Sequence, residues 1–172
     1  SNALTVEGNY SQPSGTFNGG NDMIGIDGTY TLSGGTFTAT SGSWNQQDDM
    51  TIDGLGGPPP VFNNGSGTIN FDGGSNHTTI NIGSETLNDV TIASGNYDFI
   101  VTGTMDVDGN LTVSSADITT GTITVAGNVT TTNPGDTGGG EIELDGDGDQ
   151  IISASGGSGE LPSIEINKSS GT

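Results

Sequence analysis

The chain has 172 residues, of which 28% are hydrophobic and 5% aromatic, so a rounded globule of this size is hard to fill with apolar side chains. Twenty-one acidic residues face a single base, Lys168, and the formal net charge is −20. Such a surface repels phosphate backbones and anionic lipids, which bind proteins through Lys and Arg. We therefore expect no nucleic-acid partner, and we expect the charge to keep the protein soluble or to be neutralised in part by divalent cations.

The ends of the chain and its lack of cysteine limit what can be concluded about its compartment. No disulfide or thiol chemistry is available, and no run approaches the 18 apolar residues of a membrane span, so we expect no membrane insertion. The opening Ser-Asn-Ala is typical of residues left after tag removal, and the chain stops within a strand pattern. We expect residues 1–3 to be tag-derived and residues 4–172 to form one domain excised from a longer chain.

Short alternating apolar runs, each bounded by Gly, Asn, Asp or Ser, predict a β-strand about every ten residues. In chain order the clearest are MIGID at 23–27, TINF at 68–71, TTINI at 78–82, TITV at 122–125 and EIEL at 141–144. No helical periodicity of useful length occurs, and β-branched residues dominate. Three prolines at 58–60 cannot donate to a ladder, so residues 54–61 are predicted to form a loop that leaves the stack of strands.

The strand pattern repeats with a period of about 73 residues. Residues 50–73 and 123–146 align without a gap, and the identities fall on turn glycines and strand positions such as Ile69 and Ile142. Coils of parallel β-helices hold about 20 to 25 residues, so each unit corresponds to roughly three coils and the chain to about seven. The predicted fold is an all-β, single-stranded parallel β-helix, right-handed because parallel crossovers run that way.

A β-sandwich and a β-propeller share the short strands and the turn spacing of this sequence. A sandwich usually carries a large aromatic core, whereas this chain has one Trp. A solenoid needs only thin stacked layers of Ile, Val, Leu and Thr, with Gly at tight corners. The scarcity of large residues therefore favours the solenoid.

Two strings, residues 65–95 and 108–135, resemble the β-helix repeats of very large bacterial surface and secreted proteins of the adhesin-like and autotransporter-passenger-like class. The resemblance extends over nearly all of residues 4–170, and its motifs are rich in Gly, Thr and Asn. It implies an extracellular or cell-surface location and a non-catalytic structural or adhesive role. The implied partners are neighbouring domains of the same long chain and a host-surface or glycan ligand.

Catalytic residues are not assigned by the sequence. A nucleophilic hydrolase needs an activated Ser or Cys beside a His, but His77 is the single histidine and no G-x-S-x-G elbow occurs. Carboxylates at i and i+2, Glu141 with Glu143 and Asp106 with Asp108, lie on one strand face each. They leave open an alternative, a carbohydrate-active or carbohydrate-binding β-helix that uses surface carboxylates.

The segment LDGDGDQ raises a second alternative, a calcium-dependent binding module. Asp145, Asp147 and Asp149 alternate as at the start of an EF-type loop, and carboxylate oxygens are the ligands that Ca²⁺ prefers. The sixth position is Gln150 instead of Gly, and the twelfth is Gly156 instead of Glu, so the full motif is not met. These three aspartates are therefore a candidate Ca²⁺ site, and the other interpretation of the segment is a plain acidic turn. We expect no other cofactor.

A sugar-binding cleft would also require exposed aromatic rings. We expect most of the rings available for such a cleft to be buried instead; they are Tyr10, Tyr30, Trp44, Phe62, Phe71 and Tyr97.

Overall fold

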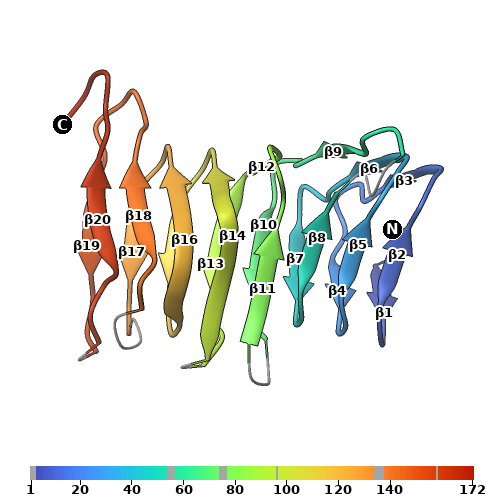
Figure 1. Ribbon diagram of the computed structural model, residues 1–172, viewed down its shortest axis with the longest axis horizontal. Coiled ribbons are helices and arrows are strands. Elements are labelled where there is room, and N and C mark those ends of the chain that lie inside the picture. The colour runs from blue at the N-terminus through green and yellow to red at the C-terminus, as the bar shows by residue number, and fades with distance from the viewer. Residues whose placement is uncertain (1–2, 54–56, 74–76, 96, 134–137, 158) are drawn as a thin grey trace.

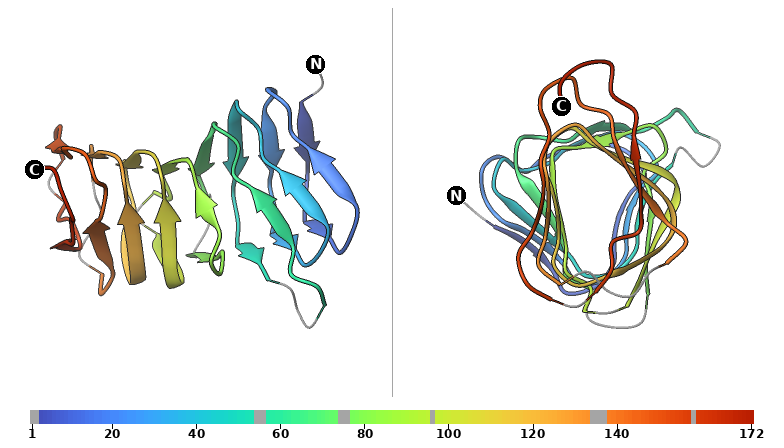
Figure 2. Two further views of the ribbon diagram at one scale, coloured as in Figure 1. Left: turned by 90° about the horizontal axis from the view of Figure 1, so that it is seen from above. Right: turned by 90° about the vertical axis from the view of Figure 1, so that its left-hand side faces the viewer.

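The computed structural model describes residues 3–53, 57–73, 77–95, 97–133, 138–157 and 159–172, and these form a parallel β-solenoid of about eight coils (Figure 1). Figure 2 shows the coils stacked one above the next along the long axis of the molecule. Within the described ranges there is no helix, and hence none that could cross a membrane. The predicted fold class is confirmed, with one coil more than the seven expected, and the right-handed winding stays a prediction.

The first sheet runs through the whole stack and takes one strand from each coil. Its strands, in order, are β1 (Leu4–Val6), β4 (Ile24–Ile26), β7 (Ser43–Gln46), β10 (Thr68–Phe71), β13 (Asp89–Ile92), β15 (Leu111–Val113), β17 (Val129–Thr131) and β19 (Ile152–Ala154).

The second sheet also runs from one end to the other. Its strands are β2 (Tyr10–Gln12), β5 (Tyr30–Leu32), β8 (Met50–Ile52), β11 (His77–Asn81), β14 (Asp98–Val107), β16 (Asp117–Val125), β18 (Glu141–Leu144) and β20 (Ser163–Ile166), with β12 (Thr86–Leu87) added beside β14. A third, short sheet contains β3 (Thr16–Asn18), β6 (Thr36–Thr38) and β9 (Val61–Asn63).

The structural repeat is the single coil. Paired positions in the first sheet lie 20 residues apart at Leu4 and Ile24, 25 apart at Trp44 and Ile69, and 18 apart at Leu111 and Val129. The 73-residue sequence period does not keep residues in one sheet throughout: Ile69 belongs to β10 in the first sheet and its counterpart Ile142 to β18 in the second, whereas Thr51 of β8 and Thr124 of β16 both belong to the second. The period therefore preserves strand and turn chemistry more consistently than it preserves the sheet to which a strand belongs.

The core is a set of in-register rows of buried side chains. One row on the first sheet consists of Ile24, Trp44, Ile69, Val90, Leu111 and Val129. Alternate residues point outward and are mostly Thr, Asn and Asp, as a pleated strand requires. Burial of these rows and the ladders between coils together stabilise the stack.

The N-terminal half of the core is aromatic, which the expected thin layers of Ile, Val, Leu and Thr did not include. Phe37 stacks on Phe17 at 4.7 Å and on Phe62 at 6.1 Å between ring centroids. Tyr30 meets Trp44 edge-on at 4.8 Å. Most of the aromatic side chains of the chain, including Tyr30, Phe37 and Trp44, thus pack together in the N-terminal coils, while Phe99 is buried farther along in β14.

Long strands turn the corner of the coil in the C-terminal half. Within β14, residues 98–101 pair with β11, and Asp106 and Val107 pair with β12. Gly121 makes the equivalent corner in β16 with a φ of 77°, and a Cβ there would lie 2.4 Å from the carbonyl oxygen of Val101. Only glycine fits such a corner.

A seam interrupts the third side of the coil. There β9 pairs with β6 alone and β12 with β14 alone, and no backbone ladder joins β9 to β12 in the described residues. The chain between β8 and β9 carries the predicted proline loop; residues 57–60 contain no strand, residues 54–56 lie outside the described residues, and Val61 already starts β9.

Candidate functional site

The three aspartates of the predicted calcium loop follow β18 and contact different partners. The Asp147 carboxylate accepts a hydrogen bond from the Ser169 hydroxyl at 2.6 Å, and that of Asp149 accepts one from the Thr172 amide at 3.0 Å. Within the described ranges, no three His, Cys, Asp or Glu side chains gather in a way that could hold a metal ion. Calcium at Asp145, Asp147 and Asp149 stays a prediction.

A cation nevertheless lies at this loop, and the chain supplies it. The Lys168 ammonium donates hydrogen bonds to the carbonyl oxygens of Gly146 and Gly148, both at 2.7 Å, and to Gln150 Oε1 at 2.6 Å. These charge-assisted contacts connect the last coil to the one before it. We call this arrangement the Lys168 clamp.

Gln150 anchors the other side of the Lys168 clamp. Its side-chain amide donates to the carbonyl oxygens of Val125 at 2.7 Å and Gly127 at 2.6 Å, while its Oε1 also accepts from the Gly146 amide at 3.1 Å. The residue that breaks the EF-type motif is thus the one that holds the loop to the preceding coil. Sequence spacing could not reveal this role, because the partners of Gln150 lie 23 and 25 residues away.

One member of each predicted carboxylate pair, Asp106 and Glu143, lies on a shared outward row of the second sheet, whereas Glu141 aligns with Thr122 and Asp108 follows the end of β14. Asp106 aligns with Thr124, and Thr124 aligns with Glu143. The Asp106 carboxylate accepts hydrogen bonds from the hydroxyls of Thr86 at 2.8 Å and Thr124 at 3.0 Å. The geometry joins these acids to coil-to-coil polar ladders, so a catalytic role for them stays a prediction.

One carboxyl next to this row, that of Asp145 directly after β18, has a raised pKa. Burial raises the pKa of the Asp145 carboxyl, and the neighbouring carboxylates of Asp106 and Glu143 raise it further. Glu143 also accepts a hydrogen bond from the Asn167 side-chain amide at 2.6 Å. The row is therefore a negatively charged stripe with hydrogen bonds that compensate part of its self-repulsion.

His77 starts β11, as expected for a histidine at the edge of a strand. Its Nδ1 lies 2.9 Å from a carboxylate oxygen of Asp98 on the next coil, and its side chain is 61% exposed. The pair is an exposed contact between neighbouring coils, of a kind that contributes little to stability.

The aromatic rings are mostly internal, as predicted. Tyr30, Trp44 and Phe71 are completely buried, and Phe62 is 7% exposed. Tyr97 is 42% exposed.

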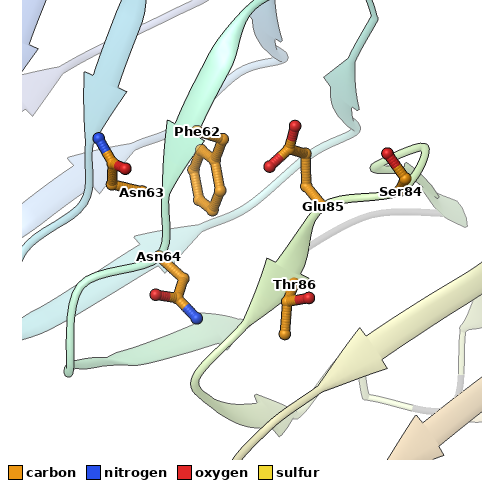
Figure 3. A pocket seen from close by; sticks show the side chains of 6 residues that line it. All are labelled: Phe62, Asn63, Asn64, Ser84, Glu85 and Thr86. Carbon is orange, nitrogen blue, oxygen red and sulfur yellow. The ribbon is translucent and has the colours of Figure 1, made fainter.

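Phe62 lines a hollow that the sequence did not predict. This hollow, about 270 Å³ in volume, lies at the seam, and its other lining residues are Asn63, Asn64, Ser84, Glu85 and Thr86 (Figure 3). A second hollow of about 150 Å³ shares Ser84 and Glu85 with it. Its remaining lining residues are Ile52, Asp53, Pro59, Pro60, Ile82 and Gly83.

Glu85 thus lies between the two hollows, which we call together the seam groove. A tight turn places it there: its amide donates to the carbonyl oxygen of Ile82 at 3.0 Å, and Gly83 within the turn has a φ of 60°. Partial burial raises the pKa of its carboxyl. The groove forms where β9 and β12 do not pair with each other in the described residues. No sequence motif predicts it.

Comparison with known proteins supplies no family. No family model matches the chain, no curated protein matches it, and no solved structure matches it. An origin in a bacterial surface protein therefore stays a prediction.

Proposed function

We propose that the chain is a non-catalytic structural segment of a bacterial extracellular surface protein, a rigid spacer whose long polar faces also serve adhesion. The observation that carries the proposal is the continuity of the first and second sheets, each of which runs through the stack from β1 to β19 and from β2 to β20. Every coil is fixed to its neighbours by ladders and by buried rows, so distance along the axis is maintained.

The outer surface supports the same proposal. Ladders of polar side chains link successive coils, for example Asn70 to Asn45 at 3.0 Å and Asn63 to Thr38 at 3.2 Å. With a net charge of −20, such faces stay hydrated and resist non-specific association. Neighbouring domains of the same longer chain are the proposed partners at the ends, and a host-surface or glycan ligand is the proposed partner of the faces.

A display experiment tests the spacer role. The chain is inserted between a cell-surface anchor and an epitope tag on bacteria, and antibody access to the epitope is compared with that for a Gly/Ser linker of the same number of residues. A rigid spacer raises access in crowded surface layers above that of the flexible linker. Equal access with the two inserts would contradict the proposal.

A further inference from the structure

The seam groove contains polar side chains that have no partner among the described residues. Within the described part of the chain, no hydrogen bond or ion pair is formed by the side chains of Asn64, Ser84 or Glu85. Figure 3 shows the Glu85 carboxylate turned toward Phe62 on the facing strand and the Asn64 amide turned toward Thr86. Elsewhere on the surface comparable groups are engaged between coils, as Asp106 is with Thr86 and Thr124.

The two halves of the groove differ in chemistry. The larger half offers a carboxylate, an amide and hydroxyls next to the Phe62 ring. The smaller half has apolar side chains, among them Pro59, Pro60 and Ile82, next to the carboxylates of Asp53 and the shared Glu85. A ligand that fits both halves has a hydrogen-bonding head and an aliphatic stem, as a lysine side chain does.

The net charge of the protein determines which kind of ligand head group the seam groove accepts. The chain carries 21 acids and one base, so its field attracts cations and repels anions. A partly buried carboxylate that has no partner among the described residues gains most from a cationic donor. The Lys168 clamp is an example within the same molecule, since carbonyl and amide oxygens hold an ammonium there at 2.6 to 2.7 Å.

We propose that the seam groove binds a primary ammonium group of the kind carried by a lysine side chain of a partner protein. Glu85 accepts hydrogen bonds from the ammonium, Asn64 and Ser84 contribute further oxygens, and Pro59 and Pro60 contact the aliphatic stem. The site gives the rod a specific point of contact for a basic partner segment. This inference does not depend on the spacer role, because binding at the groove is measured on the isolated protein.

The test is a titration of the ¹⁵N-labelled protein with n-butylammonium chloride, followed by NMR at constant ionic strength. The expected shifts lie at residues 61–64 and 82–86. Binding of the cation also lowers the raised pKa of Glu85 toward its usual range, which carboxyl ¹³C shifts measure. The neutral isostere 1-butanol is expected to produce much smaller shifts at the same residues.

Two matched variants distinguish binding at the seam groove from general electrostatic attraction of a cation to the acidic protein. Glu85→Gln removes one negative charge in the groove and is expected to weaken binding about tenfold. Glu7→Gln removes the same charge at an exposed position in the first coil and leaves binding unchanged. Equal effects of the two variants, or an absence of shifts at the groove, would overturn the proposal. Shifts at the groove with methyl α-glucoside but not with butylammonium would also overturn it and identify a sugar site.

Discussion

Substitution of Lys168 by Met removes the ammonium of the Lys168 clamp while keeping an aliphatic stem of similar length. Three charge-assisted hydrogen bonds, to Gly146, Gly148 and Gln150, are lost. Their acceptors lie near the surface, so water replaces part of the interaction, and we expect a loss of about 2 kcal/mol.

This loss is expected to be local. In a solenoid each coil contacts only its neighbours, so the last coil opens without unfolding the rest. A loss of about 2 kcal/mol corresponds to roughly a 30-fold increase in the opening equilibrium. Native-state hydrogen exchange measures it at the amides of Gln150 and Asn167, which donate to Thr172 and Leu144 across the last coils.

Two comparisons make the test decisive. The amide of Tyr30, which donates to the carbonyl oxygen of Asp49 at the other end of the stack, keeps its protection in Lys168→Met. Lys168→Arg keeps the charge but not the compact three-donor geometry, so it is expected to lose less protection. Unchanged exchange at Gln150 and Asn167, or an equal loss at Tyr30, would refute the reasoning.

The remaining predictions concern the core, the acidic row and calcium. Tyr30→Phe removes a buried hydroxyl that has no hydrogen-bond partner among the described residues, so denaturant unfolding should show a gain of about 1 kcal/mol. Burial, followed by the charge of Tyr10, raises the pKa of Tyr30, so its contribution to stability is present below about pH 10 and is lost above it; the alkaline loss monitored by Trp44 fluorescence should shrink in Tyr30→Phe, and an unchanged loss would count against this cause. The pKa of Asp145 is also raised, so the stability linked to its proton is present below about pH 4 and is lost as the pH rises through the folded-state pKa. Asp145→Asn should therefore raise the Tm at neutral pH and have less effect at acidic pH, and the opposite order would contradict the electrostatic account. Melts in EDTA and in millimolar CaCl₂ should coincide, because Ser169 and Thr172 engage Asp147 and Asp149; a large upward shift in calcium would instead establish the calcium site.

Local chemistry was sufficient to predict the strands and the class of fold. Runs such as TINF and EIEL became β10 and β18, with alternate residues buried, because period-two patterning decides which face of a strand turns inward. The prolines at 58–60 fell outside strands, since they lack the amide that a ladder requires.

The stacking of coils was less accessible from the sequence. Coil length varies from 18 to 25 residues in the first sheet. A sequence period of about 73 residues therefore does not keep strands in one sheet throughout, and Ile92 of β13 in the first sheet has Ile166 of β20 in the second sheet as its counterpart in the sequence. The period records similar strand chemistry, and the position of each strand depends on corners that are set by single glycines such as Gly121.

The sites depended on contacts between coils. Gln150 reaches carbonyl groups 23 and 25 residues away, and Lys168 reaches back 18 to 22 residues. Glu85 became a candidate because β9 and β12 fail to pair beside it. Neither the clamp nor the groove has a local sequence motif, because each forms from segments of different coils.

The central claim is that the stack is a rigid spacer, and the absence of cysteine allows a direct test. Spin labels are attached to cysteines introduced at the exposed positions Ser14 and Ser155, which lie in the first and last coils, and double electron–electron resonance measures the distance between them. The account predicts one narrow distance distribution that is the same with EDTA and with calcium. A broad or multiple distribution would contradict it, because coils that slide or separate cannot hold a fixed distance.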